Sequence, residues 1–159
     1  MRIELKGSLR SSVVLGEMLG ARHVGVECDL MGITTDSREV KTGDLFVALD
    51  GKRVSGASFL TDALSAGAGA LLVQQGIVVP DGTTALYVRD VERALLDAAR
   101  AHREQSGSLV IAVSGSAGKT TVKEGIAAML AERFSVQHSK GNFNSTVGAP
   151  LSLLSMQAG

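Results

Sequence analysis

The chain has 159 residues, and its 16 Lys+Arg side chains are balanced by 16 Asp+Glu. A net charge of zero gives no electrostatic reason to expect nucleic acid or an anionic membrane as partner, and an aromatic content of 3% without tryptophan argues against base-stacking surfaces. The one cysteine, Cys28, cannot form an internal disulfide, and neither a signal peptide nor an apolar run of transmembrane length is found. We therefore expect a soluble, cytoplasmic protein without membrane insertion.

The apolar pattern predicts alternating helices and strands, which is typical of the α/β class. In chain order, the predicted elements are a helix over 11–19, a buried strand over 45–49, a helix over 58–66, strands over 70–73 and 84–88, and an amphipathic helix over 91–103. The first half of the segment 32–51 is polar, so we expect a loop there.

The last third of the chain begins with a predicted linker, EQSGS over 104–108, which is polar and contains glycine. The β-branched run LVIAV over 109–113 predicts a buried strand, and a helical pattern follows over 120–134. We therefore expect two α/β units. Residues 1–105 form a small N-terminal domain, and residues 106–159 form the beginning of a second domain with a parallel sheet.

Between the last predicted strand and helix lies SGSAGKTTVKE, from Ser114 to Glu124. Glycines allow backbone N–H groups to approach phosphate oxygens, and the start of the helix adds partial positive charge. The match is to the short form G-x-x-G-K-T, because Val113 stands where the eight-residue phosphate loop has glycine. The alternative is an ordinary glycine-containing turn with a surface lysine. The candidate nucleotide-binding residues are Gly115, Ser116, Ala117, Gly118, Lys119, Thr120 and Thr121.

Three separated blocks in this order resemble the Mur ligases of peptidoglycan synthesis. They are TDSREVKTGDLFVALDGKR with SAGAGALLV (35–53 and 65–73), SGSAGKTTVKE (114–124), and HSKGNFNSTVGAPLSLL (138–154). The pattern is most similar to the branch that adds D-alanyl-D-alanine to UDP-N-acetylmuramoyl-tripeptide. The resemblance implies an ATP- and Mg²⁺-dependent amide ligase that works through an acyl phosphate. It also implies that the N-terminal domain, here 1–105, binds the UDP part of the substrate and that the central domain binds ATP.

The resemblance also assigns roles to single residues. Lys119 is implied as the catalytic residue that stabilises the phosphates, and Thr120 as a ligand of Mg²⁺. Asn142 and Asn144 are implied to line the cleft between UDP-substrate and nucleotide; the alternative for GNFN is a polar loop with helix-capping asparagines. Ser37 and Arg38 match a block near the uridine site. Arg38 could hold a diphosphate through two hydrogen bonds, or be an ordinary surface arginine.

The sequence departs from the family pattern at several positions. Ala117 stands where asparagine is usual in the loop, and Ser145 replaces the second asparagine of G-N-x-N-N. Ala57-Ser58-Phe59 replaces a frequent His-Asp-Phe. By the resemblance, the acidic metal ligand and the closing domain are expected beyond Gly159. We therefore expect little or no turnover by this chain alone, and self-association through an incomplete apolar surface in 109–159.

Three other functions remain open on the sequence. One is the neighbouring ligase that adds the third residue of the stem peptide, which VKE and GNFN disfavour. Another is a non-catalytic module that binds a uridine nucleotide through residues 1–105. The third is an unrelated phosphate-loop kinase or regulatory NTPase, which the N-terminal blocks do not support.

Overall fold

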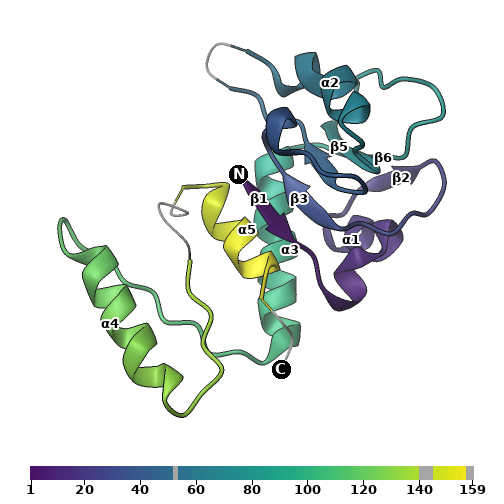
Figure 1. The fold of residues 1–159 in the computed structure, drawn as a ribbon. Helices are drawn as coiled ribbons and strands as arrows, with labels where there is room; N and C mark the ends of the chain where they lie inside the picture. The colour runs from purple at the N-terminus through teal and green to yellow at the C-terminus, as the bar shows by residue number, and fades with distance from the viewer. Residues whose placement is uncertain (52–53, 140–144, 157–159) are drawn as a thin grey trace.

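The computed structural model describes residues 1–51, 54–139 and 145–156. Its six strands form one mixed sheet in the spatial order β1-β3-β4-β5-β6-β2 (Figure 1). The central strands β3, β4, β5 and β6 are parallel to one another, and β1 and β2 join the two edges in antiparallel pairing. The strand bounds are β1 Arg2–Glu4, β2 Arg22–Val24, β3 Gly32–Thr34, β4 Leu45–Val47, β5 Ala70–Gln74 and β6 Ala85–Val88.

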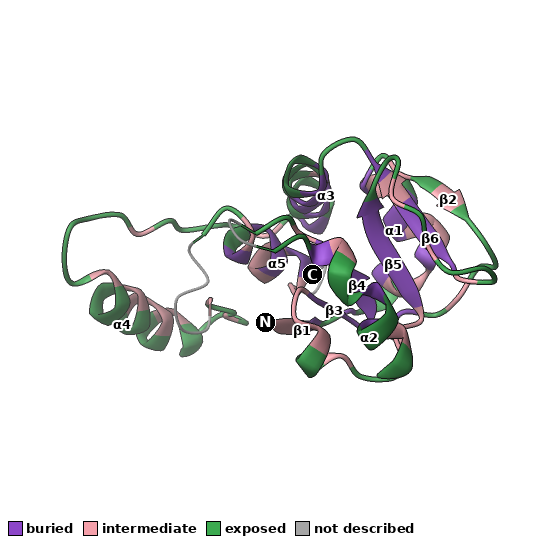
Figure 2. Ribbon diagram, turned by 90° about the horizontal axis from the view of Figure 1, so that it is seen from above, coloured by how far each residue is buried: buried purple, intermediate pink, exposed green. Residues whose placement is uncertain are grey.

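Helices cover both faces of this sheet. The α-helices are α1 Ser12–Met18, α2 Leu60–Ser65, α3 Val91–Ser106, α4 Lys119–Ala131 and α5 Gly148–Leu154, with short 3₁₀ helices η1 Gly7–Arg10, η2 Ser37–Glu39 and η3 Gly56–Phe59. Figure 2 shows α1 and α3 on one face of the sheet and α2 on the other. α4 lies apart from this three-layer unit in both views.

The sheet is buried on both faces because side chains alternate along its parallel strands. In β4, Leu45 and Val47 pack into the larger cluster, which also contains the buried leucines of α1, α3 and α5, while Phe46 packs with α2 on the opposite face. This two-sided burial explains why the central strands are continuous apolar runs in the sequence. The predicted α/β class is confirmed.

The predicted helices and central strands of the first hundred residues are confirmed, with bounds shifted by a few residues. The polar segment after position 32 is not entirely a loop, since β3 occupies its first three residues. The edge strands β1 and β2 were not predicted. α3 runs to Ser106 and ends at Gly107, whose φ of +65° is the left-handed conformation that favours glycine at a helix C-terminus. The first part of the predicted linker is therefore helical.

The strand predicted over 109–113 is wrong. This stretch has no regular structure, and Leu109 is 88% exposed, Val110 42% and Ile111 51%. A β-branched run becomes a strand only when a neighbouring strand satisfies its backbone, and none of the described residues pairs with it. The helix after the loop is confirmed as α4, and none of its residues is buried.

α5 returns to the three-layer unit and packs against α3. Its Leu151 and Leu154 are buried in the same cluster as the sheet residues. No helix in the described part of the chain is long and apolar enough to cross a membrane.

Candidate functional site

The phosphate-type loop leads directly into the first turn of α4. Gly118 is the N-cap of this helix and has a φ of +74°, where a side chain would be strained. Gly115 also has a positive φ, of +153°. The loop from Ser114 to Gly118 is exposed, so its backbone N–H groups and those of the first helical turn are accessible to a ligand. The first four N–H groups of an α-helix have no partner within the helix, and they carry the partial positive charge of its N-terminus.

Lys119 folds back over this loop. Its ammonium group donates a hydrogen bond to the backbone carbonyl of Gly115, four residues earlier. Thr120 and Thr121 follow in the first turn and are exposed. The first turn contains no acidic side chain, so nothing in it opposes the approach of an anion. The loop, the ammonium group and two hydroxyls are thus gathered at one helix end.

Two further contacts follow this loop in the sequence, one on α4 and one at the start of α5, and the sequence did not reveal them. The ammonium group of Lys123, on the second turn of α4, donates to the carbonyl oxygen of Ser139 at 2.6 Å. The hydroxyl oxygen of Ser145 accepts a hydrogen bond from the backbone N–H of Gly148 at 3.0 Å. The departure at Ser145 therefore caps the start of α5. Asn142 and Asn144 lie outside the described residues.

Ser37 and Arg38 lie in η2, directly after β3, at the carboxyl end of the parallel strands. Ser37 is half-buried. The guanidinium group of Arg38 donates two hydrogen bonds to the Asp36 carboxylate, at 2.9 and 2.7 Å. Hydrogen bonding by the Arg38 side chain, and then by its backbone N–H, lowers the pKa of Asp36 to about 2. The side chain of Arg38 is nevertheless 87% exposed, so another anion can reach it.

A cavity of about 230 Å³ lies at the same carboxyl end of the parallel strands. Residues that follow three parallel strands line it, namely Asp50 after β4, Gln74 at the end of β5 and Arg89 after β6, together with the start of α3. Ligands of open α/β sheets bind outside the carboxyl ends of the strands. Reading off the residues that follow each predicted strand would have found these three.

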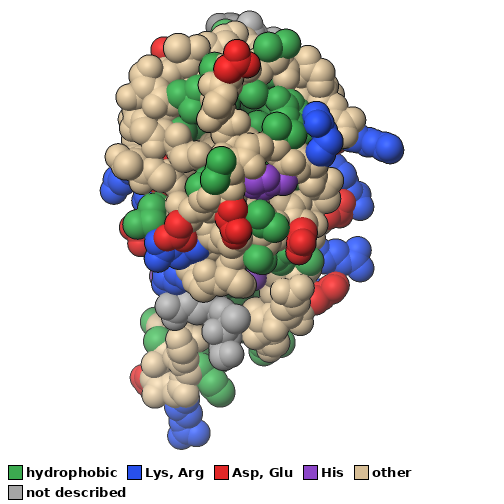
Figure 3. All heavy atoms as spheres, turned by 90° about the vertical axis from the view of Figure 1, so that its right-hand side faces the viewer, with side chains coloured by type: hydrophobic (Ala, Val, Ile, Leu, Met, Phe, Trp, Pro, Cys, Tyr) green, Lys and Arg blue, Asp and Glu red, His purple; other side chains and the backbone are tan. Residues whose placement is uncertain are grey.

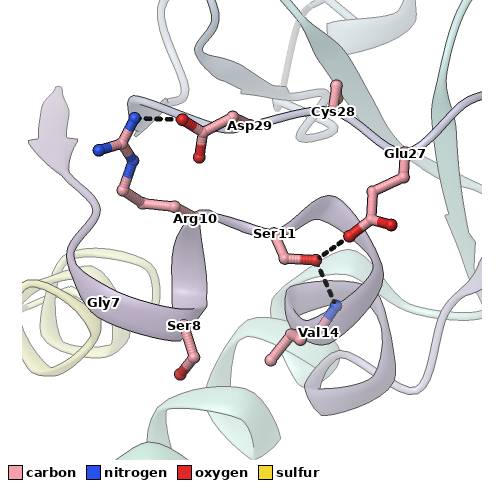
Figure 4. Close-up of a pocket in the computed structure, with 8 residues that line it drawn as sticks. All are labelled: Gly7, Ser8, Arg10, Ser11, Val14, Glu27, Cys28 and Asp29. Atoms are coloured by element: carbon pink, nitrogen blue, oxygen red, sulfur yellow. Dashed lines mark hydrogen bonds and ion pairs between the residues drawn. The ribbon is translucent and has the colours of Figure 1, made fainter.

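A larger hollow, of about 520 Å³, lies at the amino end of the parallel strands, between η1, α1 and the segment before β3 (Figure 4). Its three charged side chains each contact a neighbouring residue. Arg10 pairs with Asp29, and the Ser11 hydroxyl donates to Glu27 at 2.7 Å. The Ser11 oxygen in turn accepts from the N–H of Val14 at the start of α1. These contacts hold the 25–31 segment against α1, and this is a structural role.

The structure brings Lys119, Thr120 and Thr121 together with the loop glycines, and it places Ser37 and Arg38 on the sheet. It does not bring these two groups into contact, because α4 lies apart from the sheet (Figures 1 and 2). On the face in Figure 3, basic and acidic side chains are interspersed. Among the side chains that the structure describes, that face therefore shows no extended basic surface of the kind that binds nucleic acid.

Comparison with known proteins gives consistent matches. The sequence model described as "Mur ligase family, catalytic domain" matches residues 29–138. The UDP-N-acetylmuramoyl-tripeptide–D-alanyl-D-alanine ligase of Bacillus subtilis is 38% identical over 126 residues, covering 79% of this chain and 28% of the relative. Among solved structures, MurF from Acinetobacter baumannii matches with a TM-score of 0.84 and 28% identity, over 98% of this chain and 34% of that one.

A second solved structure, MurF from Thermotoga maritima in complex with ADP, matches with a TM-score of 0.67 and 37% identity. It is matched over 77% of this chain and 28% of its own. The chain thus spans about a third of the length of the proteins it matches. The family model covers more than half of the chain, and the sequence and structural relatives agree with it. The chain belongs to the Mur ligase family.

Proposed function

We propose that this chain carries the UDP-substrate-binding part and the nucleotide loop of an ATP-dependent ligase that joins D-alanyl-D-alanine to UDP-N-acetylmuramoyl-tripeptide. The observation that carries the proposal is the loop geometry. Gly115 and Gly118 with positive φ open α4, and the Lys119 ammonium lies over the loop. Relatives named for this reaction, and a neighbour with bound ADP, support it. A cytoplasmic location is part of the same proposal.

In the proposed reaction, the substrate carboxylate attacks the γ-phosphorus of ATP and ADP leaves, which gives an acyl phosphate. The amine of D-alanyl-D-alanine then attacks the acyl carbon and inorganic phosphate leaves. The loop N–H groups and Lys119 stabilise negative charge on the phosphates during the first step. Mg²⁺ would supply further neutralisation of that charge, and the hydroxyl of Thr120 is a suitable oxygen ligand for it. Mg²⁺ is usually bound by one or two carboxylates together with substrate phosphates and water, so Thr120 would be one ligand among several.

The UDP part is proposed to bind along the carboxyl edge of the sheet, where Ser37, Arg38 and Arg89 are found. A diphosphate would compete with Asp36 for the two donors of Arg38. Asn142 and Asn144 are proposed to complete the cleft. The proposed division is a UDP-binding domain over 1–105 and the beginning of the ATP-binding domain over 106–159.

Self-association is a second proposed property of the isolated chain. Leu109, Met129 and Phe134 are large apolar side chains that are at least 65% exposed. None of the residues of α4 is buried. Such surface promotes association in water. Sedimentation velocity should show a mass that rises with concentration. The double variant Met129→Ser/Phe134→Ser should remain monomeric.

The proposed function is tested by measuring how tightly the 159-residue chain binds Mg-ADP. The binding is measured by calorimetry. Lys119→Met should weaken binding at least tenfold, because it removes the only ammonium group that contacts the loop among the described residues. Lys6→Met is the matched control, since Lys6 is exposed and lies between β1 and η1, on the sheet unit from which α4 lies apart.

UDP is titrated separately, with amide NMR shifts as the readout. Shifts at the carboxyl edge without any response to Mg-ADP would favour the non-catalytic uridine module. If the wild-type chain responds to neither ligand, both parts of the proposal are wrong.

A further inference from the structure

α5 carries buried groups that the proposed chemistry does not use. Leu151 and Leu154 are 0% and 1% exposed, and Pro150 and Gly148 are buried with them. Their partner is α3, whose inward stripe continues to His102. α5 lies beyond the phosphate-type loop in the sequence, yet it packs into the core of the sheet unit that precedes the loop.

A hydrogen bond adds to this packing at the C-terminal end of α5. Nε2 of His102 lies 3.0 Å from the carbonyl oxygen of Met156, just after α5. A carbonyl only accepts, so Nε2 carries the hydrogen and donates it. His102 itself is 8% exposed. A buried hydrogen bond of this kind is costly to leave unmade, so the contact fixes where α5 ends along α3.

We propose that the α3–α5 contact is a latch that positions the phosphate-type loop relative to the UDP-binding edge, with His102, Leu151 and Leu154 as positioning residues. The inference rests on the proposed function. We call residues 108–139, which include the loop and α4, the nucleotide arm. The chain leaves α3 at Gly107, passes through the nucleotide arm, and returns to α3 through α5.

The need for a latch follows from the arm itself. α4 has no buried residue, and the stretch from Gly107 to Ser114 is without regular structure. A single tether of seven extended residues allows the loop to range over roughly 25 Å from the end of α3. A second tether at α5 reduces that freedom, because a chain fixed at both ends samples a smaller volume. The Lys123–Ser139 contact shortens this second tether by holding the chain to α4 as far as residue 139. The effective concentration of bound nucleotide near the UDP edge rises accordingly.

The test uses the 159-residue chain without ligands, with spin labels on both units. Cys28 is replaced by serine, and labels are placed at Val78→Cys on the sheet unit and Glu132→Cys at the end of α4, both exposed positions. Pulsed electron resonance then measures the distribution of distances between the labels. Hydrogen exchange of the α5 amides reports on docking in the same samples.

The double variant Leu151→Ala/Leu154→Ala should release α5. We expect at least tenfold faster exchange of its amides and a broader distance distribution than in the wild type. Leu96→Ala is the matched control, since Leu96 lies on α3 but is 47% exposed, and both readouts should stay unchanged. Unchanged exchange in the double variant would overturn the latch. Faster exchange with an unchanged distribution would overturn its positioning role.

His102 gives a second test that leaves the apolar packing in place. His102→Leu should broaden the distribution, and His102→Gln should restore it, because the glutamine amide donates from about the same point as Nε2. Equal distributions in these two variants would refute the role of the hydrogen bond. None of these readouts needs a nucleotide, so a failure of the proposed function, seen as absent Mg-ADP binding, is distinguishable from a failure of the latch.

Discussion

The substitution Asp44→Asn should destabilise the sheet unit far more than the removal of an exposed charge such as Asp29. Asp44 precedes β4 and its side chain is completely buried. Its carboxylate accepts hydrogen bonds from Nε and Nη2 of Arg2, at 2.6 and 2.8 Å, and from the backbone N–H of Lys41, at 2.9 Å. It therefore ties the first strand to the turn that begins β4.

The magnitude follows from what the substitution leaves unpaired. Asparagine keeps the shape but has one acceptor oxygen and no charge, so it cannot serve all three donors. Breaking a buried ion pair by removing one partner costs about 3–5 kcal/mol. Arg2 is 15% exposed and lies in an edge strand, so it can regain some hydration, and we take the lower limit of about 3 kcal/mol. For a chain of this length that corresponds to a fall in Tm of about 6–12 °C.

The assay is urea and thermal unfolding of the chain, followed by circular dichroism. Asp29→Asn is the control, because Asp29 is 63% exposed and its partner Arg10 is also accessible. Such surface pairs contribute about 0–1 kcal/mol. A double-mutant cycle with Arg2→Met isolates the pair itself. A loss below about 1 kcal/mol for Asp44→Asn, or a coupling energy near zero, would refute the reasoning.

Two further predictions concern the candidate site. Gly118→Ala should weaken Mg-ADP binding by about five- to thirtyfold, since alanine at a φ of +74° costs about 1–2 kcal/mol. Gly125→Ala in the open interior of α4 should instead stabilise that helix by about 0.5–1 kcal/mol and leave binding intact. Calorimetry with Mg-ADP distinguishes the two variants. The pKa of Asp36 should be about 2 by carbon NMR, below its ordinary value of 3.8, and Arg38→Gln should return it toward that value. Because the folded pKa is the lower one, the stability it contributes is complete above pH 3.8 and is lost as the pH falls through about 2. Saturating UDP should raise this pKa if the diphosphate takes over Arg38, and an unchanged value would show that Arg38 does not bind it.

The central strands and α3 could be predicted because the sequence signals for their burial lie within each segment. β4 and β5 are buried on both faces, so each is a continuous apolar run. α3 has a complete inward stripe, an Asp90 cap that accepts from the N–H of Arg93, and Gly107 at its end. These signals need no knowledge of the rest of the fold.

The edge strands could not be predicted for the opposite reason. β1 is RIE and β2 is RHV, and each of these three-residue strands has a single apolar side chain. Each exists because it pairs with a central strand far along the chain, as Ile3 does with Ile33. The run LVIAV shows the converse, since its residues favour a strand but have no partner among those described. Strand propensity is realised only through pairing.

The same distinction applies to the candidate site. The phosphate-type loop works through backbone N–H groups and one adjacent lysine, all within six residues, so its motif is readable from the sequence. The contacts that would place it are distant in sequence. Lys123 meets Ser139 across 16 residues, and His102 meets the Met156 carbonyl across 54. Neither pair has a motif, because a backbone carbonyl accepts from any donor that the fold delivers to it. In this chain the groups proposed to do the chemistry are therefore local in sequence, and the groups proposed to position them are not.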